Sequence, residues 1–227
     1  MNEFQPNIQD PERALMQAYA DERERLAAFA VTDIPEGDYL HPVFGEGNAP
    51  CEVLLLGEAP GSEEAKSSRP FVGKAGKQLD KLLLMSGIDR TRVYVSNIVK
   101  YRPVLRSEHS IRNRTPGRTE ILQALPLLSI ELGHIKPVYL VTLGNTPLRA
   151  IQMLAGEAPD TIGALHGKSH TIRLDGRNVD LWPLYHPASG IYNRALVSAM
   201  EADAKRLGEQ LVKAQQSAMF VDTTVIY

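Results

Sequence analysis

The sequence predicts an α/β protein, a three-layer α/β/α sandwich around a central, mostly parallel sheet of four strands. Short apolar runs alternate with amphipathic helical stretches along the chain, which is the order typical of a layered α/β fold. Residues 53–56 form a continuous apolar run that ends at Gly57, as expected for a strand buried on both faces of a parallel sheet. We expect a single domain over residues 1–227, with a core at about 50–214 and a helical segment at 10–30.

The other elements follow from local patterns. Residues 11–29 carry apolar side chains at helical spacing, with Asp10 and Pro11 as the N-cap and the first helical residue. Residues 31–50 are rich in Gly, Pro and Asp, which predicts a surface loop, and residues 218–227 are expected to form a tail or an added strand. Further strands are expected at 93–99, 137–144 and 181–185, a hairpin at Asp175-Gly176, and helices at 77–84, 120–132, 148–154 and 196–214.

Composition narrows the class of protein. With 43% hydrophobic and 23% charged residues, the chain has the composition of an ordinary soluble domain. A formal net charge of −2 supplies no global basic field, so any binding to nucleic acid must rest on local patches. A single cysteine excludes an internal disulfide framework and a multi-thiolate metal site. We find no signal-peptide pattern and no apolar run of 18 residues, and we therefore expect a cytoplasmic protein.

The connection after the first predicted strand is the strongest functional signal. It runs from Gly57 to Gly76, whereas ordinary strand-to-helix connections have about 2–6 residues. Ligands of open α/β sheets bind beyond the carboxyl ends of the strands, so we expect a ligand-binding loop here. Asn97 and His186 follow near the ends of two other predicted strands and belong at the same edge.

Four segments of the chain resemble the uracil-DNA glycosylase superfamily, and most closely its family 4. They are GEAPG at 57–61, RPFVGKAG at 69–76, NIVKYRP at 97–103 and YHPAS at 185–189. They occur in the family's order, and the resemblance covers roughly residues 50–196. It implies the fold of that superfamily and a monofunctional uracil-DNA glycosylase of base excision repair. Such an enzyme hydrolyses the N-glycosidic bond of a flipped-out deoxyuridine and leaves an abasic site.

The resemblance assigns roles in a base pocket to four side chains. Phe71 would stack on the everted base, unless it is only a core residue. Asn97 would pair with O4 and N3–H of uracil through its amide, unless it caps the strand end. His186 would donate a hydrogen bond to uracil O2 as charge develops there, although a lone histidine before proline is more often structural. Glu58 would position water or orient the pocket, because Ala59 stands where some families carry an aspartate.

The remaining candidate residues would hold DNA, and the expected partner is uracil-containing DNA bound by a monomer. Backbone N–H groups around Ala59 and Gly61 could hold the base or a phosphate. Ile191 or Tyr192 would enter the minor groove as a wedge. A basic patch at 102–118 would contact phosphates, with a solvated charged loop as the alternative. The predicted phosphate contacts are Lys74, Arg102, Arg114 and Ser189.

The chain departs from the family in two places. Family 4 members hold a [4Fe–4S] cluster on four cysteines, but two of these positions fall on Tyr101 and Ala124, and no cysteine precedes Cys51. We therefore predict no iron–sulfur cluster, with Tyr101 and Ala124 packing in its place. The loop at 104–114 is enlarged and contains His109, and one branch of the superfamily has a histidine in such a loop that traps the sugar covalently. A uracil-binding or single-stranded-DNA-binding protein without turnover, or with covalent trapping, is the alternative function.

Overall fold

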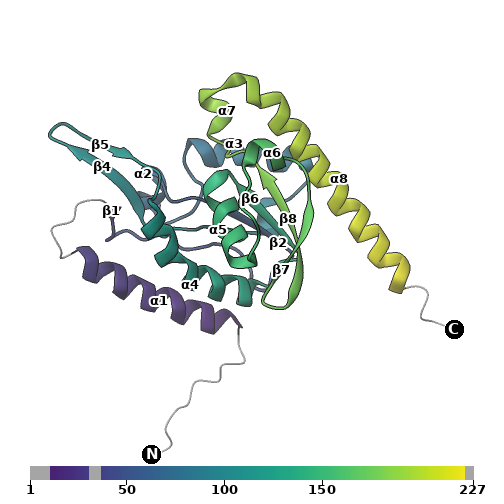
Figure 1. The fold of residues 1–227 in the computed structure, drawn as a ribbon, viewed down its shortest axis with the longest axis horizontal. Helices are drawn as coiled ribbons and strands as arrows, with labels where there is room; N and C mark the ends of the chain where they lie inside the picture. Colours follow the sequence, from purple (N-terminus) through teal and green to yellow (C-terminus); the bar gives the residue numbers. More distant parts are fainter. Residues whose placement is uncertain (1–10, 31–36, 223–227) are drawn as a thin grey trace, which may run out of the picture.

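The main sheet positions the functional site. The structure, a computed structural model, describes residues 11–30 and 37–222. The sheet has the order β3-β2-β6-β8-β7, with the first four strands parallel and β7 antiparallel at the edge (Figure 1). The four predicted parallel strands are confirmed, and the predicted hairpin at Asp175-Gly176 adds the fifth strand. The strands are β3 (Val93–Asn97), β2 (Val53–Gly57), β6 (Tyr139–Leu143), β8 (Arg177–Leu184) and β7 (His170–Leu174).

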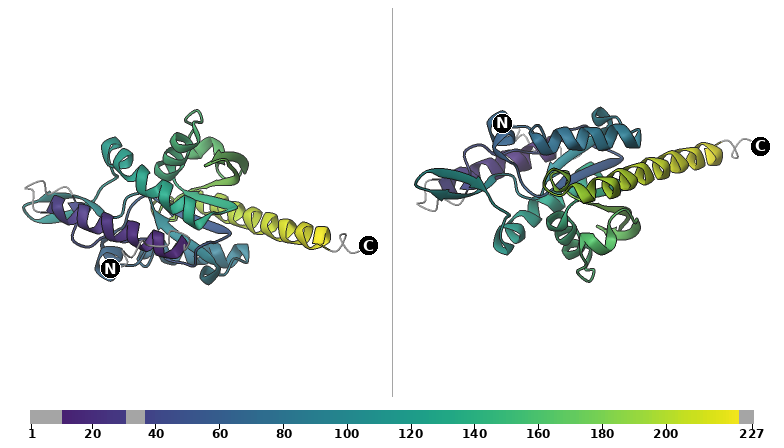
Figure 2. Two further views of the ribbon diagram at one scale, coloured as in Figure 1. Left: turned by 90° about the horizontal axis from the view of Figure 1, so that it is seen from below. Right: turned by 90° about the horizontal axis from the view of Figure 1, so that it is seen from above.

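Helices cover both faces of this sheet, which confirms the three-layer arrangement (Figures 1 and 2). Leu54 and Leu56 of β2 enter one core, and Val53 and Leu55 enter the core on the opposite face. Both sets of side chains are buried, which explains why the run at 53–56 is apolar throughout. The first core contains α1 (Pro11–Ala30), α4 (Arg118–Ile135) and α5 (Asn145–Ala155), and the second contains α3 (Lys74–Ser86) and α8 (Val197–Asp222).

A smaller antiparallel sheet stands beside the main one, in the order β1-β4-β5. β1 (Gly37–Asp38) pairs with β4 (Arg102–Ser107), which turns back into β5 (Ser110–Asn113). The β4–β5 hairpin projects from the body of the molecule (Figure 1). The enlarged loop predicted at 104–114 is therefore mostly this hairpin. Its two strands pair up to a two-residue connection, an arrangement that gives a tight hairpin turn.

The connection after β2 is not a plain loop. It contains the short helix α2 (Ser62–Ser67), and α3 begins at Lys74 rather than at residue 77. Both helices have a glycine as N-cap residue, Gly61 and Gly73, so neither start carries a Ser, Thr, Asp or Asn side chain at the N-cap position. The remaining short elements are η1 (Arg90–Arg92), α6 (Ile162–Leu165), α7 (Ser189–Tyr192) and η2 (Arg194–Leu196).

The N-terminal helix matches the prediction from the sequence, whereas the C-terminal helix extends beyond its predicted end. The predicted N-terminal helix is confirmed, and it contributes Leu15, Tyr19 and Leu26 to the core beneath α4. The C-terminal helix α8 continues to Asp222, so residues 218–222 are helical and do not form an added strand. Residues 31–36 and 223–227 lie outside the described residues. Within the described ranges no helix is long and apolar enough to cross a membrane.

Gly208 lies where α8 crosses α3, and its substitution tests this packing. A Cβ at residue 208 would lie 2.1 Å from the carbonyl oxygen of Ser86. Alanine favours a helix by about 0.8–1.0 kcal/mol over glycine. We nevertheless expect Gly208→Ala to lower the free energy of unfolding by about 1–3 kcal/mol through overpacking, as measured by urea titration.

Gly133→Ala is the matched control, because Gly133 lies inside α4 and a Cβ there would meet nothing within 4 Å. This substitution should raise the free energy of unfolding by about 0.5–1 kcal/mol. If both substitutions raised the free energy of unfolding by the same amount, the helices α3 and α8 would not be in close contact at Gly208.

Candidate active site

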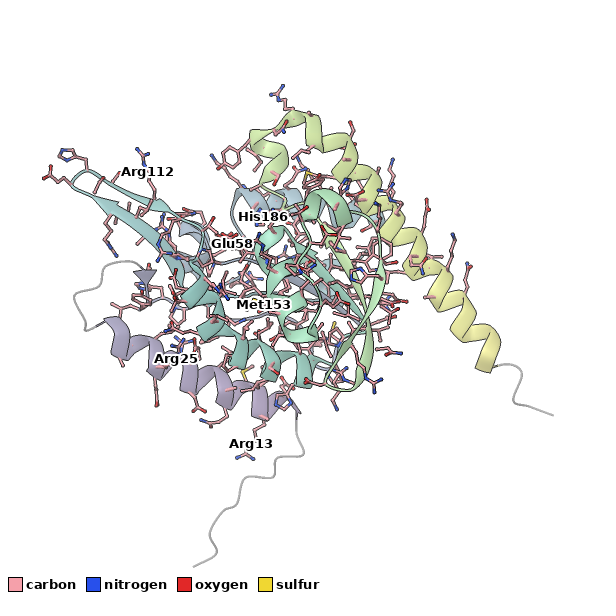
Figure 3. All side chains as sticks on the ribbon, viewed as in Figure 1. Arg13, Arg25, Glu58, Arg112, Met153 and His186 are labelled. Atoms are coloured by element: carbon pink, nitrogen blue, oxygen red, sulfur yellow. The ribbon has the colours of Figure 1, made fainter. Side chains whose placement is uncertain are left out.

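A cleft of about 650 Å³ lies beyond the carboxyl ends of β2, β3 and β8. Figure 3 shows Glu58 and His186 in this region, between the β4–β5 hairpin and α7. The structure thus brings most of the predicted site residues together from four separate segments. The predicted residues that line the cleft are Glu58, Ala59, Gly61, Phe71, Lys74, Asn97, Arg114, His186, Ile191 and Tyr192.

Asn97 ends β3 with its amide group unengaged. The residue is 3% exposed, and no hydrogen bond from the described part of the chain reaches its side-chain amide. The amide therefore does not cap the strand end. Gly57 is its register partner on β2, and a Cβ there would lie 2.4 Å from Asn97 Oδ1 and 2.5 Å from Phe71 Cζ. The glycine thus leaves room for the amide and the ring beside the strand end.

Phe71 is held in a backbone conformation that bulky residues rarely adopt. Its φ of 54° lies in the left-handed region, which is a strained position for an aromatic residue. Arg90 Nη2 donates to the carbonyl oxygens of Pro70 and Phe71 at 3.0 and 3.3 Å, and Arg90 Nη1 binds Asp80 at 2.7 Å. A Cβ on Gly76 would lie 1.8 Å from the Phe71 carbonyl oxygen, so only glycine fits there. The ring packs in the core and also lines the cleft, so its place in the core is compatible with the predicted stacking on a base.

His186 presents a defined neutral tautomer. Its Nδ1 accepts the backbone N–H of Ala188 at 3.2 Å, so in the neutral ring the proton resides on Nε2. Burial lowers the pKa of His186 from 6.5 to about 4, while the charge of Glu64 acts in the opposite direction. The ring lies 6.2 Å from the Phe71 ring, centroid to centroid. At neutral pH the cleft therefore has an uncharged N–H donor beside an aromatic face.

Glu58 also lines the cleft and is fixed by both its backbone and its side chain. Its carbonyl oxygen accepts the Val99 N–H at 3.1 Å, which continues the pairing of the β2 and β3 ends. Its Oε2 accepts a hydrogen bond from Thr146 Oγ1 at 2.6 Å. Thr146 belongs to the first turn of α5, and sequence reasoning missed it because the contact spans 88 positions.

Glu64 is a second residue that sequence reasoning missed. Its carboxylate accepts the N–H of Gly61 at 3.1 Å and the N–H of Gly73 at 2.8 Å, which ties the two glycine-rich segments together. The Gly61 N–H is thus engaged by Glu64 in this structure, and the predicted use of backbone N–H groups around Ala59 and Gly61 to hold a base or phosphate stays a prediction. A glutamate three residues after a helix N-cap is a capping signal that could have identified Glu64.

The predicted DNA contacts divide into two groups. Lys74 is exposed at the start of α3, and Ile191 and Tyr192 are 45% and 88% exposed on α7. Arg114 lines the cleft, but its guanidinium binds the Glu120 carboxylate at 3.0 Å and the Val104 carbonyl oxygen.

Arg102 and Ser189 are not among the residues that line the cleft, and their predicted contacts with phosphates stay a prediction. Arg102 Nε instead binds Asn113 Oδ1 at 2.7 Å, and the Ser189 N–H binds the His186 carbonyl oxygen at 2.8 Å. Asn113 and Thr115, which were not predicted, line the cleft from the base of the hairpin.

His109 lies at the tip of the hairpin, away from this site. Its side chain is 93% exposed and approaches only Glu108, at 4.0 Å, among the described ion pairs. It is not among the residues that line the cleft. The structure thus gives no support to covalent trapping by His109.

Comparison with known proteins agrees with this geometry. The family model for the uracil DNA glycosylase superfamily matches residues 44–208. The chain belongs to this superfamily. It is 36% identical over 166 residues to the type-4 uracil-DNA glycosylase of Sulfurisphaera tokodaii, covering 73% of this chain and 72% of that protein. The type-4 enzymes of Saccharolobus solfataricus and Thermotoga maritima are 34% and 35% identical, covering 74% and 67% of this chain and 74% and 73% of those proteins.

The iron–sulfur cluster that the resemblance implies does not fit the residues present. Tyr101 and Ala124 both line a separate hollow of about 390 Å³ and belong to the core. The Tyr101 ring lies 4.5 Å from the Tyr39 ring, and its hydroxyl donates to Glu120. Neither side chain is a thiolate, and Cys51 lies in a different hollow, with its sulfur close to the carbonyl oxygen of Arg92. No step of the chemistry below involves such a cluster.

The His186 tautomer and its lowered pKa can be tested by nitrogen-15 NMR of the imidazole. Because burial disfavours the charged ring, we expect the neutral Nε2–H form from pH 8 down to about pH 5. In urea the unfolded chain should show the same histidine titrating near its ordinary value of about 6.5. The unfolded state then binds the proton first, so this group lowers folded-state stability as pH falls from about 7 to 4. A folded-state transition near pH 6.5 would contradict the buried, neutral assignment.

Proposed function

We propose that this protein is a uracil-DNA glycosylase, which hydrolyses the N-glycosidic bond of deoxyuridine flipped out of DNA and acts in base excision repair. One observation carries the proposal: a buried, unengaged amide and a neutral imidazole donor line the same cleft. An amide offers one donor and one acceptor edge, which matches N3–H and O4 of uracil. The family and the type-4 relatives support the same activity.

The proposed reaction uses charge that develops on the departing base. As the bond between C1′ and N1 breaks, the sugar gains positive charge and uracil gains negative charge, mostly at O2. His186 Nε2–H donates to that oxygen and stabilises it most strongly in the transition state. A neutral donor suffices, which agrees with the lowered pKa of His186. Water then adds to C1′, its proton leaves to solvent or a base, and uracil departs as an anion that later takes up a proton.

The other cleft residues supply positioning in this proposal. Phe71 stacks on the everted base, and its restrained backbone keeps the ring in place before the substrate arrives. Glu58 positions the attacking water or orients the pocket, with its carboxylate held by Thr146. The backbone at Ala59 faces the base from the same loop.

DNA binding completes the proposal. Ile191 and Tyr192 are exposed apolar and aromatic side chains at the rim, which suits a wedge inserted where the base leaves the stack. Lys74 contacts a phosphate beside the cleft. Arg102, Arg114 and Ser189 also contact phosphates in this proposal, and the two arginines would exchange internal hydrogen bonds for these contacts. We include in the proposal that the enzyme acts as a monomer in the cytoplasm.

The activity is tested with end-labelled DNA that contains one uracil, either single-stranded or paired with guanine. After alkaline cleavage of abasic sites, single-turnover rates are read from a denaturing gel. We expect His186→Ala to lower the rate by about 10²–10³-fold, because one donor to the developing oxyanion is lost. Asn97→Asp should lower it by at least about 10-fold, because the carboxylate lacks the amide donor and leaves a polar group unpaired.

His109→Ala is the matched control, a histidine removed outside the cleft, and its rate should equal that of the wild type. Background rates for the wild type on both substrates would overturn the proposal. A protein–DNA adduct without alkali that disappears in His109→Ala would instead establish covalent trapping.

Glu58→Gln separates the two roles left for this residue. The substitution keeps the shape and removes the negative charge. If Glu58 activates or positions water, the single-turnover rate should fall by about 10²–10⁴-fold, the usual effect of losing a general base. Thr146→Val keeps the carboxylate but removes its hydrogen bond, so its loss should be smaller. A Glu58→Gln rate equal to that of the wild type would assign Glu58 to pocket orientation alone.

A further inference from the structure

An ion pair lies completely buried directly behind Asn97. Lys100 Nζ and Glu131 Oε2 are 2.7 Å apart, and each side chain is 1% exposed. Lys100 follows the end of β3, and Glu131 lies in α4. Neither residue lines the cleft, so the base-binding chemistry described above does not use them directly.

The hydrogen bonds of the Lys100 ammonium converge on the end of β3. Besides both oxygens of Glu131, at 2.7 and 2.8 Å, Nζ donates to Ser96 Oγ at 2.8 Å and to the Asn97 carbonyl oxygen at 2.6 Å. Ser96 Oγ in turn donates to Glu131 at 3.0 Å. The peptide group of Asn97 is therefore fixed by a charged donor on the side away from the cleft, while its amide remains available to a ligand.

The same network has a second end that does not touch Asn97. The Tyr19 hydroxyl donates to Glu131, and the hydroxyl groups of Tyr19 and Tyr94 lie 2.9 Å apart. Both rings are buried in the core. Substitutions at the far end and at the near end of the network can therefore be compared within one set of contacts.

Stability alone does not account for this arrangement. Burial lowers the pKa of Lys100, and Glu131 acts in the opposite direction, so the pair offsets a desolvation cost that an apolar pair would not incur. Replacing a buried ion pair by apolar groups is often neutral or stabilising, whereas removing one partner leaves a buried charge and destabilises. The hydrogen bond from the Lys100 ammonium to the Asn97 carbonyl oxygen is a contact that an apolar pair could not make.

We propose that Lys100, held by Glu131, is a positioning residue for uracil recognition by Asn97. Its ammonium fixes the last peptide of β3, and this sets the direction in which the amide enters the cleft. The inference rests on the proposed function, because it assumes that the Asn97 amide reads the base.

The test uses the full chain and the double variant Lys100→Met/Glu131→Gln, which removes both charges and leaves no unpaired buried ion. Tyr94→Phe is the matched control, since it removes a hydroxyl from the far end of the network. Folding is verified by urea titration before single-turnover uracil excision is measured. We expect the double variant to lose about 10- to 100-fold in rate, as expected for a displaced recognition group. Tyr94→Phe should stay within about 3-fold of the wild type, because it does not touch the Asn97 peptide.

A double-mutant cycle on the single-turnover rates distinguishes positioning of Asn97 from a general structural role of the ion pair. In an Asn97→Ala background, removal of the Lys100–Glu131 pair should cause no further loss of rate. In a His186→Ala background it should cause the full loss, because His186 acts independently at O2. Inhibition by free uracil should weaken by a similar factor in the double variant and be unchanged in Tyr94→Phe.

The outcomes separate this inference from the proposed function. If the wild type does not release uracil, the proposed function itself is wrong. If the wild type is active and Asn97→Ala is impaired, but the folded double variant matches the wild type, only the positioning role is overturned. Equal losses from the double variant in both backgrounds would also overturn it, because the pair would then act on the whole fold and not through Asn97.

Discussion

The parallel pairing of β2 with β3 is the constraint on which the candidate site depends. It places Gly57 opposite Asn97, and the absence of a side chain at residue 57 leaves space for the amide and for the Phe71 ring. The two segments stay paired just beyond the strands, where the Ile98 N–H donates to the Gly57 carbonyl oxygen at 2.9 Å. Main-chain bonds therefore hold together two distant segments of sequence, and their functional side chains need no bond to each other.

Around this junction, three charged side chains form hydrogen bonds with backbone groups of the protein itself. The Glu64 carboxylate accepts hydrogen bonds from two glycine N–H groups. The Arg90 guanidinium donates to the carbonyl oxygens of Pro70 and Phe71. The Lys100 ammonium donates to the carbonyl oxygen of Asn97. Each of these contacts fixes a segment that carries a cleft residue. The cleft is thus shaped before a substrate binds, which is the condition under which fixed dipoles contribute most to catalysis.

The strands and most pocket residues could be predicted because they leave local signals. A strand buried on both faces must be apolar, and Asn97 and His186 follow strand ends within recognisable motifs. The hairpin at residues 102–113 was missed because its charged side chains obscure the alternation. Glu64 and Thr146 were missed because their roles exist only when distant segments meet. The ion pair of Arg114 with Glu120 was missed for the same reason, since α4 brings Glu120 to it.

Helix α1 has a consequence that resemblance alone would not suggest. The family match begins at residue 44, yet Leu15, Tyr19 and Leu26 of this helix lie in the core that covers Glu131. This helix acts as a dielectric shield, because it separates an internal pair of charges from water. A fragment trimmed to the matched segment would keep every residue that lines the cleft but lose the helix that packs over the region behind Asn97. The segment that matches the family model is therefore smaller than the packed unit that encloses the buried charges.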